Sequence, residues 1–528
     1  NSDLKKAGGA DEPAGLFSVM LYKCVERKES RMIMLPQRFK ERMRELLGEE
    51  YSAFEASYEQ EKVQGLRFNS LKTKEGKAPD WEETGVKELA EKTAHILNIE
   101  LTQVPWVKEG YYYPLEARLG KHPFHEAGLY YIQEPSAMSV VELLDPKPGD
   151  HVLDLCAAPG GKSSHIASRL KGEGFLLSNE IHPGRAKILS QNMERMGVGN
   201  CVVTNEDAKR LAKAFPGFFD RIAVDAPCSG EGMFRKEEEA VKQWSEEHVK
   251  MCAARQQEIL EDAASMLKPG GTMVYSTCTF APEENEGTIL SFLKKHEDFY
   301  LEERKCPKGL MEAVPGWAFY GQEKEEGKTE SIEKFHLERA FRIMPHKTEG
   351  EGHFMAVLRR KEDAGGFFGK RSQPSYIDPK KEKEVIKELW RFLDETLTEP
   401  ENLKMREEYL RFGDQLYLLP PQMISLKGLK VLRPGLHIGT IKKNRLEPSH
   451  ALALWLKQEQ AKVWKEMEPN SVEAVKYLKG ETLTGDTGMS APCEKGWVLI
   501  CTGNVSLGWG KMAAGTIKNH YPKGLRWM

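Results

Sequence analysis

The stretch Val152-Leu153-Asp154-Leu155-Cys156-Ala157-Ala158-Pro159-Gly160-Gly161-Lys162 decides the fold of this chain. Its apolar start predicts a buried strand, its glycines predict a tight turn, and the residues up to Leu170 predict a helix. Glycines allow the backbone to approach a ligand closely. The spacing fits neither the Gly-x-Gly-x-x-Gly dinucleotide motif nor the Walker motif, so phosphate binding is the less favoured use of this turn.

Short apolar runs followed by helical patterns continue from this stretch to Arg360. They lie at residues 174–178, 201–204, 222–224, 273–275 and 354–358. Strands that alternate with helices predict an α/β fold with a mostly parallel sheet covered on both faces. Such sheets bind ligands at the carboxyl ends of their strands, so we expect the chemistry there.

The 528 residues suggest about three or four domains at roughly 100–200 residues each. Residues 1–33 show no period and are expected to be a disordered leader. Residues 34–124 predict a small α+β domain and 125–362 the α/β domain, while residues 363–376, with two adjacent glycines and a proline, predict a linker. Residues 377–528 then form a further C-terminal region.

Composition excludes several classes of protein. With 40% hydrophobic and 30% charged residues and a net charge of -3, the chain is an ordinary globular protein. No stretch reaches the roughly 20 apolar residues that a bilayer crossing needs. Its nine cysteines are odd in number and contain no Cys-x-x-Cys pair, which disfavours a disulfide framework and a zinc knuckle. We therefore expect a cytoplasmic protein with no membrane partner and no metal.

Positive charge is concentrated near the C-terminus. Residues 427–528 hold 16 lysines and arginines against 8 aspartates and glutamates, although the whole chain is slightly acidic. Aromatic residues, including Trp509, Tyr521 and Trp527, lie among these basic side chains. This mixture favours RNA as the partner of the C-terminal region.

Acidic residues follow the next three predicted strands of the α/β domain: Glu180, Asp207 and Asp225. An acid after the second strand can accept the hydroxyls of a ribose, and one after the third can accept an adenine amine. Each acid alone would fit a helix cap, but the ordered set with the glycine turn predicts binding of S-adenosyl-L-methionine. The residues predicted to contact this cofactor are Cys156, Ala157, Ala158, Pro159, Gly160, Gly161, Lys162, Glu180, Asp207 and Asp225.

Two cysteines, Cys228 and Cys278, follow the fourth and fifth predicted strands. A thiol beside a methyl donor suits methylation of cytosine at C5, because a thiolate that adds to C6 makes C5 nucleophilic. Asp225 is the predicted acid that supports this addition near N3. The second cysteine could assist the later elimination, and chemistry alone does not say which cysteine attacks.

Three segments resemble the Nop/Sun family of RNA cytosine-C5 methyltransferases. They are Asp154 to Lys162, Asp225-Ala226-Pro227-Cys228-Ser229-Gly230, and Ser276-Thr277-Cys278-Thr279 with Pro282-Glu283-Glu284-Asn285-Glu286. The resemblance implies a Rossmann-like methyltransferase core in which Cys278 is the nucleophile and Cys228 helps to release the product. Bacterial DNA cytosine methyltransferases attack with their Pro-Cys cysteine instead, so this order rests on the resemblance.

Further segments are similar to the bacterial RsmF branch of that family, which acts on 16S ribosomal RNA. They are Leu119-Gly120-Lys121-His122-Pro123, Tyr131-Ile132-Gln133-Glu134-Pro135, Gly350-Glu351-Gly352-His353-Phe354 and Lys518-Asn519-His520-Tyr521-Pro522. The branch implies a ferredoxin-like N-terminal region, a PUA-like RNA-binding domain at the C-terminus, and ribosomal RNA or the small ribosomal subunit as partner.

Four other residues are weaker candidates. Arg235 and Lys236 could contact RNA phosphates, and Tyr131 and Gln133 could line the pocket for an unpaired or extruded cytosine. Two alternatives stay open: a transfer RNA substrate, and a non-catalytic ribosome-assembly factor that uses the fold to bind RNA. The sequence carries no signal for an oligomeric state.

Overall fold

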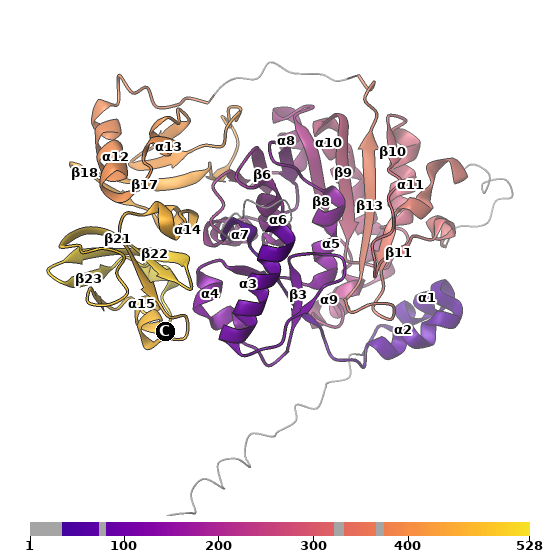
Figure 1. The fold of residues 1–528 in the computed structure, drawn as a ribbon. Coiled ribbons are helices and arrows are strands. Elements are labelled where there is room, and N and C mark those ends of the chain that lie inside the picture. Colours follow the sequence, from indigo (N-terminus) through magenta and orange to yellow (C-terminus); the bar gives the residue numbers. More distant parts are fainter. Residues whose placement is uncertain (1–33, 73–80, 322–331, 366–373) are drawn as a thin grey trace, which may run out of the picture.

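The computed structural model describes residues 34–72, 81–321, 332–365 and 374–528 (Figure 1). The expected leader and most of the expected linker lie outside these ranges. Within them, no helix combines the length and apolar character that a bilayer crossing requires.

A ten-stranded sheet forms the centre of the molecule, in the order β11-β12-β13-β9-β8-β5-β6-β7-β16 with β10 beside β13. The five strands from β9 to β7 pair in parallel, and the others pair antiparallel. This confirms the predicted mostly parallel α/β core. The strands are β5 (His151–Asp154), β6 (Phe175–Asn179), β7 (Cys201–Thr204), β8 (Phe219–Asp225), β9 (Leu267–Thr277), β10 (Phe299–Leu301), β11 (Met311–Glu312), β12 (Phe341–Ile343), β13 (His353–Arg360) and β16 (Val431–Arg433).

Helices cover both faces of this sheet. Successive side chains of a strand point to opposite faces, so apolar side chains on both faces pack against helices. Val152 belongs to the core cluster that includes residues of α5, α6 and α7, whereas its neighbour Leu153 belongs to the cluster that includes residues of α8, α10 and α11. The helices are α5 (Pro135–Leu144), α6 (Gly161–Leu170), α7 (Pro183–Arg195), α8 (Ala208–Ala214), α9 (Glu238–Gln243), α10 (Glu246–Met266) and α11 (Glu286–Lys295).

In its described residues the N-terminal region contains four α-helices and a small antiparallel sheet in the order β2-β3-β1-β4. With α3 after β1 and α4 after β3, this is the β-α-β-β-α-β arrangement of a ferredoxin-like domain, as the resemblance implied. Its elements are α1 (Gln37–Leu47), α2 (Tyr51–Ser57), β1 (Gln64–Phe68), α3 (Trp81–Leu97), β2 (Thr102–Gln103), β3 (Gly110–Tyr113), α4 (Pro123–Glu126) and β4 (Tyr130–Ile132).

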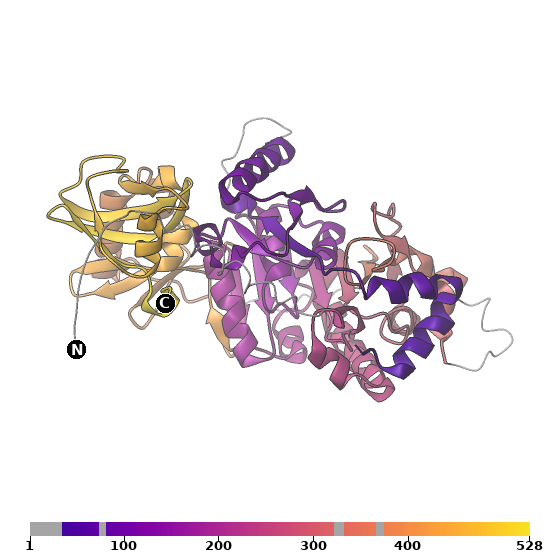
Figure 2. The same ribbon diagram turned by 90° about the horizontal axis from the view of Figure 1, so that it is seen from below.

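The C-terminal region holds two further sheets, β14-β15-β17-β18 and β19-β21-β22-β23-β20. Between β15 and β17 of the first sheet the chain adds β16 to the edge of the central sheet, an addition that its three residues gave no pattern to predict. Figure 2 shows these sheets and helices α1 and α2 at opposite ends of the molecule. The elements are α12 (Lys383–Thr396), α13 (Glu401–Lys404), β14 (Tyr409–Phe412), β15 (Gln415–Leu418), β17 (Leu436–Lys442), β18 (Arg445–Pro448), α14 (His450–Trp455), β19 (Trp464–Met467), α15 (Val472–Leu478), β20 (Leu483–Thr484), β21 (Lys495–Thr502), β22 (Val505–Ala513) and β23 (Thr516–Asn519).

Candidate active site

The two predicted cysteines meet at the carboxyl ends of neighbouring strands. Cys228 follows β8 and Cys278 follows β9, and the parallel register places Asp225 opposite Ser276. The two Sγ atoms are 3.3 Å apart, and both thiols are free and partly buried. The spacing of 50 residues in sequence thus becomes direct contact, because both strands end at the same edge of the sheet.

A buried ion pair lies beside this thiol pair. Lys162 Nζ is 2.6 Å from Asp225 Oδ2, and Ser276 Oγ donates to Asp225 Oδ1 over 2.8 Å. Burial alone would raise the pKa of Asp225, but Lys162, His353 and Ser276 outweigh it and lower that pKa below its usual value. Burial lowers the pKa of Lys162, but Asp225, Asp154 and Cys278 together raise it. Asp225 is therefore a carboxylate and Lys162 an ammonium group.

A buried carboxyl group lies on the other side of the thiols. Glu284 Oε2 accepts from Ser229 N over 3.0 Å and from Gln256 Nε2 over 2.8 Å, and Gln256 Nε2 also donates to Pro227 O. These bonds hold the backbone on both sides of Cys228. Burial raises the pKa of Glu284 to about 8 despite the bonds from Ser229 and Gln256. This group was quoted in the sequence only as part of a motif, and nothing in its spacing predicted the contact.

Helices α1 and α2 brace the loops that carry the cysteines. Phe39 packs against Phe234 beyond the Cys228 loop, and Phe54 packs against Phe280 beyond the Cys278 loop, with ring centroids 5.0 and 5.3 Å apart. The buried Arg42 of α1 adds two hydrogen bonds to Glu283 at 3.0 and 2.7 Å. The N-terminal helices therefore help to fix the loops at the active edge.

The prediction that Arg235 contacts RNA phosphate is wrong. Its side chain is only 5% exposed and bonds to Glu351 Oε2 at 2.6 Å, Ser57 O at 2.9 Å and Gly350 O at 2.9 Å. Lys236 lies 3.6 Å from the other oxygen of Glu351. A guanidinium group with these three internal partners serves packing of α2 against the catalytic domain.

The glycine turn is held by neighbours on two sides. Gly160 has a φ of 114° and caps α6, and a Cβ on it would lie 3.0 Å from Met193 Cε. A Cβ on Gly161 would lie 3.1 Å from Gln133 Nε2 and 3.4 Å from Tyr131. The buried pair Tyr131 and Gln133 therefore packs against the turn. Nothing larger than glycine fits at either position without movement.

Other parts of the turn are also engaged. Arg185 donates to Ala158 O over 2.7 Å, Asn192 donates to Pro159 O over 2.8 Å, and Ala157 N donates to Asn179 O over 2.8 Å. Burial raises the pKa of the Cys156 thiol, so this cysteine stays a neutral thiol. Its sulfur is inert at ordinary pH.

The strand-end acids surround one space, with different exposure. Asp154 is buried, and burial, Asp225 and Glu180 all raise its pKa, which reaches about 7 despite opposing effects of Ser163 and Lys162. Its Oδ1 has no hydrogen-bond partner among the described residues. Glu180 is buried and accepts from His182 N over 2.8 Å, whereas the exposed Asp207 caps α8 by accepting from Arg210 N over 2.9 Å. An orphaned carboxylate oxygen among further acids fits a cationic ligand such as a sulfonium cofactor.

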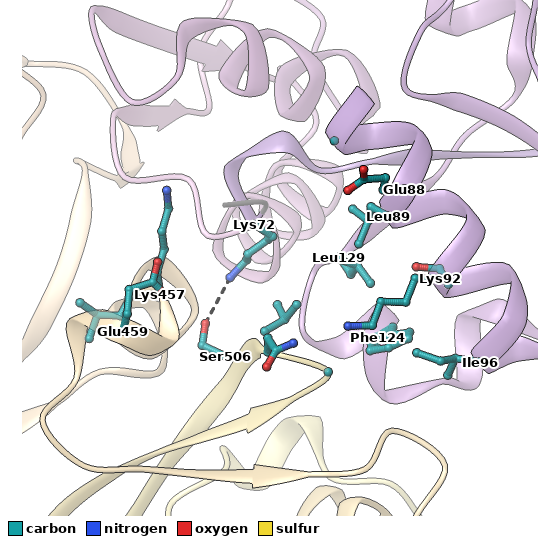
Figure 3. A pocket seen from close by; sticks show the side chains of 16 residues that line it. Lys72, Glu88, Leu89, Lys92, Ile96, Phe124, Leu129, Lys457, Glu459 and Ser506 are labelled. Carbon is teal, nitrogen blue, oxygen red and sulfur yellow. Dashed lines mark hydrogen bonds between the residues drawn. The ribbon is translucent and has the colours of Figure 1, made fainter. Parts of the chain in front are cut away.

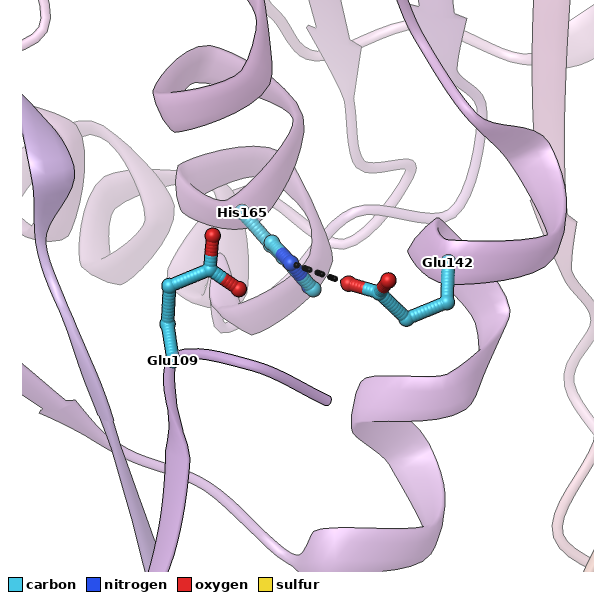
Figure 4. Close-up of side chains that lie close together, drawn as sticks. All are labelled: Glu109, Glu142 and His165. Carbon is cyan, nitrogen blue, oxygen red and sulfur yellow. Dashed lines mark ion pairs between the residues drawn. The ribbon is translucent and has the colours of Figure 1, made fainter. Parts of the chain in front are cut away.

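One cluster away from this edge has the composition of a metal site. Glu109, Glu142 and His165 offer ligand atoms within 4.8 Å of one another, and Figure 4 shows Glu142 facing His165. Arg169 pairs with both carboxylates, at 3.0 Å to Glu109. Burial, Arg67 and Arg169 lower the pKa of His165 well below its usual value. The guanidinium group already supplies the positive charge that these acids need.

Comparison with known proteins gives four matches along the chain. Family profiles described as 16S rRNA methyltransferase RsmB/F, N-terminal domain of 16S rRNA methyltransferase RsmF, RsmF rRNA methyltransferase first C-terminal domain, and methyltransferase RsmF PUA domain match residues 141–359, 35–135, 391–456 and 465–527. They follow one another in the order of the structural regions described above.

Two curated relatives are named ribosomal RNA small subunit methyltransferase F. The one from Escherichia coli O81 (strain ED1a) is 30% identical and covers 93% of this chain and 97% of its own length. The one from Vibrio campbellii is also 30% identical and covers 93% and 98%. A solved methyltransferase homolog from Pyrococcus horikoshii is 29% identical over 62% of this chain and 96% of its own, with a TM-score of 0.51.

Proposed function

This chain belongs to the RsmF family of 16S rRNA methyltransferases, and from that premise we propose that it forms 5-methylcytosine in 16S ribosomal RNA through a covalent bond between Cys278 and C6 of the base. S-adenosyl-L-methionine would supply the methyl group and would be held by the residues from Cys156 to Lys162 with Glu180, Asp207 and Asp225. Residues 125–362 would carry the chemistry and residues 377–528 would bind the ribosomal RNA, in the cytoplasm.

The contact between two thiols with different ionisable neighbours carries this proposal. Cys278 lies close enough to the Lys162 ammonium group to be among the groups that raise the pKa of Lys162. The pKa of Cys228 is raised well above its usual value by its hydrogen bond with Cys278, by burial and by the charge of Glu284. The thiol of Cys228 would therefore keep its proton and donate a hydrogen bond to Cys278 Sγ. This asymmetry supports the order of roles that the resemblance implied.

The reaction follows from these charges. Attack of Cys278 Sγ on C6 forms the S–C6 bond and moves the double-bond electrons towards C5, which then takes the methyl group. Once Cys278 is bonded to carbon, it no longer accepts a hydrogen bond from Cys228, so the largest cause of the raised Cys228 pKa is gone. The Cys228 thiol then releases its own proton to solvent, and the resulting thiolate removes the C5 proton. The electron pair of that C–H bond restores the double bond and expels Cys278 as a thiolate.

The contact with Lys162 restricts what Asp225 can do in the reaction. Because Lys162 holds it as a carboxylate, it would accept a hydrogen bond from the cytosine 4-amino group. It would protonate N3 only after the base has displaced part of its contact with Lys162. Ser276 Oγ, which donates to Asp225 Oδ1, would hold the carboxylate in place in either state.

The direct test is transfer of labelled methyl from S-adenosyl-L-methionine to small ribosomal subunits, free 16S ribosomal RNA and transfer RNA, followed by nucleoside analysis. We expect labelled 5-methylcytosine in the 16S samples. Label confined to transfer RNA would overturn the substrate, and a different labelled nucleoside would overturn the chemistry. No label in any sample would favour the non-catalytic assembly factor.

A further inference from the structure

A cavity of about 270 Å³ lies between the N-terminal domain and the C-terminal region, away from the cysteines. Its walls come from α3 and the segment near β4 on one side, and from the β21–β22 turn and the segment after α14 on the other (Figure 3). Lys72 joins the two sides, because its ammonium group donates to Leu454 O and, over 3.5 Å, to Ser506 Oγ. The volume of the cavity is close to the lower limit for small-molecule sites, which is about 300 Å³.

Three lysines from different segments line this cavity: Lys72, Lys92 and Lys457. Two glutamates, Glu88 and Glu459, also lie in its lining, but no ion pair joins either one to these lysines in the part of the chain that the structure describes. Burial lowers the pKa of Lys72 to about 7, with no carboxylate among the causes. Lys72 is therefore only partly charged at neutral pH and already donates to Leu454 O and Ser506 Oγ. Lys92 and Lys457, which have no ion pair in the described part of the chain, supply the positive charge for an anion.

The remaining wall is apolar and includes an aromatic ring. Leu89, Phe124 and Leu129 line the cavity, and Asn504 adds an amide that can both donate and accept hydrogen bonds. Phe124 is only 2% exposed, so the partly exposed Leu89 and the exposed Asn504 supply the surface for the base of a nucleotide, while ammonium groups pair with its phosphate. The volume is sufficient for one nucleoside but not for a folded element.

We propose that this cavity is a second RNA contact, which takes one unpaired nucleotide of the substrate between Leu89 and the ammonium groups of Lys92 and Lys457. The inference rests on the proposed function, because it names part of the surface that holds the ribosomal RNA. It assigns RNA binding jointly to the N-terminal domain and the C-terminal region. A nucleotide held there would fix the RNA relative to the distant cysteines.

The first test compares two charge-reversed double variants. Lys92→Glu with Lys457→Glu changes one exposed lysine of α3 and one residue of the C-terminal region inside the cavity. Lys87→Glu with Lys479→Glu makes the same charge change on the same two regions outside it. Binding of a fluorescent single-stranded RNA is measured by anisotropy at several salt concentrations. We expect the first pair to weaken binding about 10-fold or more and to flatten the salt dependence by about 0.7 per lost phosphate contact. We expect the second pair to stay within about 2-fold.

Equal losses in both pairs would mean that net charge alone matters and would overturn the proposal, as would no loss in the first pair. A second measurement needs no variant: RNA containing 4-thiouridine is cross-linked to the wild-type protein and the attached peptides are identified. Cross-links to Leu89 or Asn504 support the cavity, and cross-links only elsewhere overturn it.

Competition with cytidine monophosphate separates a free nucleotide from RNA. Displacement of the RNA by the mononucleotide at equal affinity would assign the cavity to a free nucleotide and overturn the RNA contact. Methyl transfer by the wild-type enzyme is a separate readout. If transfer is present but the cavity variants bind normally, only this inference fails. If transfer is absent but RNA still cross-links here, only the proposed function fails.

Discussion

The two thiols at the ends of β8 and β9 are the same chemical group 3.3 Å apart, yet their ionisable neighbours differ. The Cys278 side contains the Lys162 and Asp225 ion pair, whereas the Cys228 side contains the buried carboxyl of Glu284. A cation favours a thiolate and an anion favours a thiol. The difference teaches that neighbouring charge, and not the cysteines themselves, can decide which sulfur attacks and which one carries the proton.

Removing each sulfur in turn is the strongest way to break this comparison. Cys278→Ala is expected to lower methyl transfer on the order of 10⁴-fold or more, because it removes the proposed nucleophile. Cys228→Ala is expected to form the bond to C6 but to release the product slowly. A slow-migrating RNA–protein band on a denaturing gel should therefore accumulate with Cys228→Ala. Accumulation with Cys278→Ala instead would reverse the two roles.

Replacing the Lys162 ammonium group by an uncharged side chain should make the surroundings of Cys278 and Cys228 more alike. Lys162→Met is expected to lower kcat/KM on the order of 10²-fold, the scale of one lost charge-stabilising donor. It should also slow alkylation of Cys278 by iodoacetamide, measured at pH 7 in a Cys228→Ala background. Lys162→Arg keeps the charge and should recover much of the alkylation rate. An unchanged alkylation rate in folded Lys162→Met would show that the ammonium group does not activate Cys278.

Removing the ionisable carboxyl of Glu284 acts on the Cys228 side and on stability. The pKa of Glu284 is raised to about 8 in the folded protein, so between about pH 4.5 and 8 the folded state binds more protons than the unfolded state. Stability due to this group therefore falls as pH rises through that window. Glu284→Gln should remove the fall, so its advantage over wild type grows by at most about 1.4 kcal/mol per pH unit. Thermal unfolding at several pH values measures it.

The control for this experiment is Glu247→Gln, an exposed glutamate of α10. It removes one charge without touching the cysteine loops, and its melting temperature should follow wild type at every pH. A parallel pH dependence in Glu284→Gln and wild type would show that the buried carboxyl does not titrate in this range.

Sequence patterns predicted the parallel core and the meeting of Cys228 with Cys278, because both follow from strands that end at one edge. The position of the glycine turn was predictable for the same reason, because the turn follows a strand that ends at this edge. The ion pair and the buried hydrogen bonds beside the cysteines could not be predicted. Lys162 contacts Asp225, which is 63 residues away in sequence, and Glu284 contacts Ser229, which is 55 residues away. Such contacts depend on side-chain packing, which carries no periodic signal.

The failure of the Arg235 prediction has the same origin. An Arg-Lys pair after a catalytic loop resembles a phosphate contact in sequence, but α2 covers it and Ser57 and Glu351 satisfy it. The strand β16 was missed because three residues form no pattern, and its pairing with β7 needs a partner more than 200 residues away. Local sequence predicts helices and strands well, but it predicts poorly which distant segments of the chain come into contact.

The smallest expected effect sharpens the comparison on the cofactor side, where Asp207 has two possible uses. Its Oδ1 caps α8 by accepting from Arg210 N, and its exposed carboxylate is also the proposed partner of an adenine amine. Asp207→Ser keeps a good cap, whereas Asp207→Ala loses it at a cost of about 1 kcal/mol in stability. Both variants lose the adenine contact, so both should weaken cofactor binding by about 3- to 10-fold, measured by calorimetry. Unchanged affinity in Asp207→Ser would leave Asp207 as a helix cap alone, because that variant alters only the second oxygen.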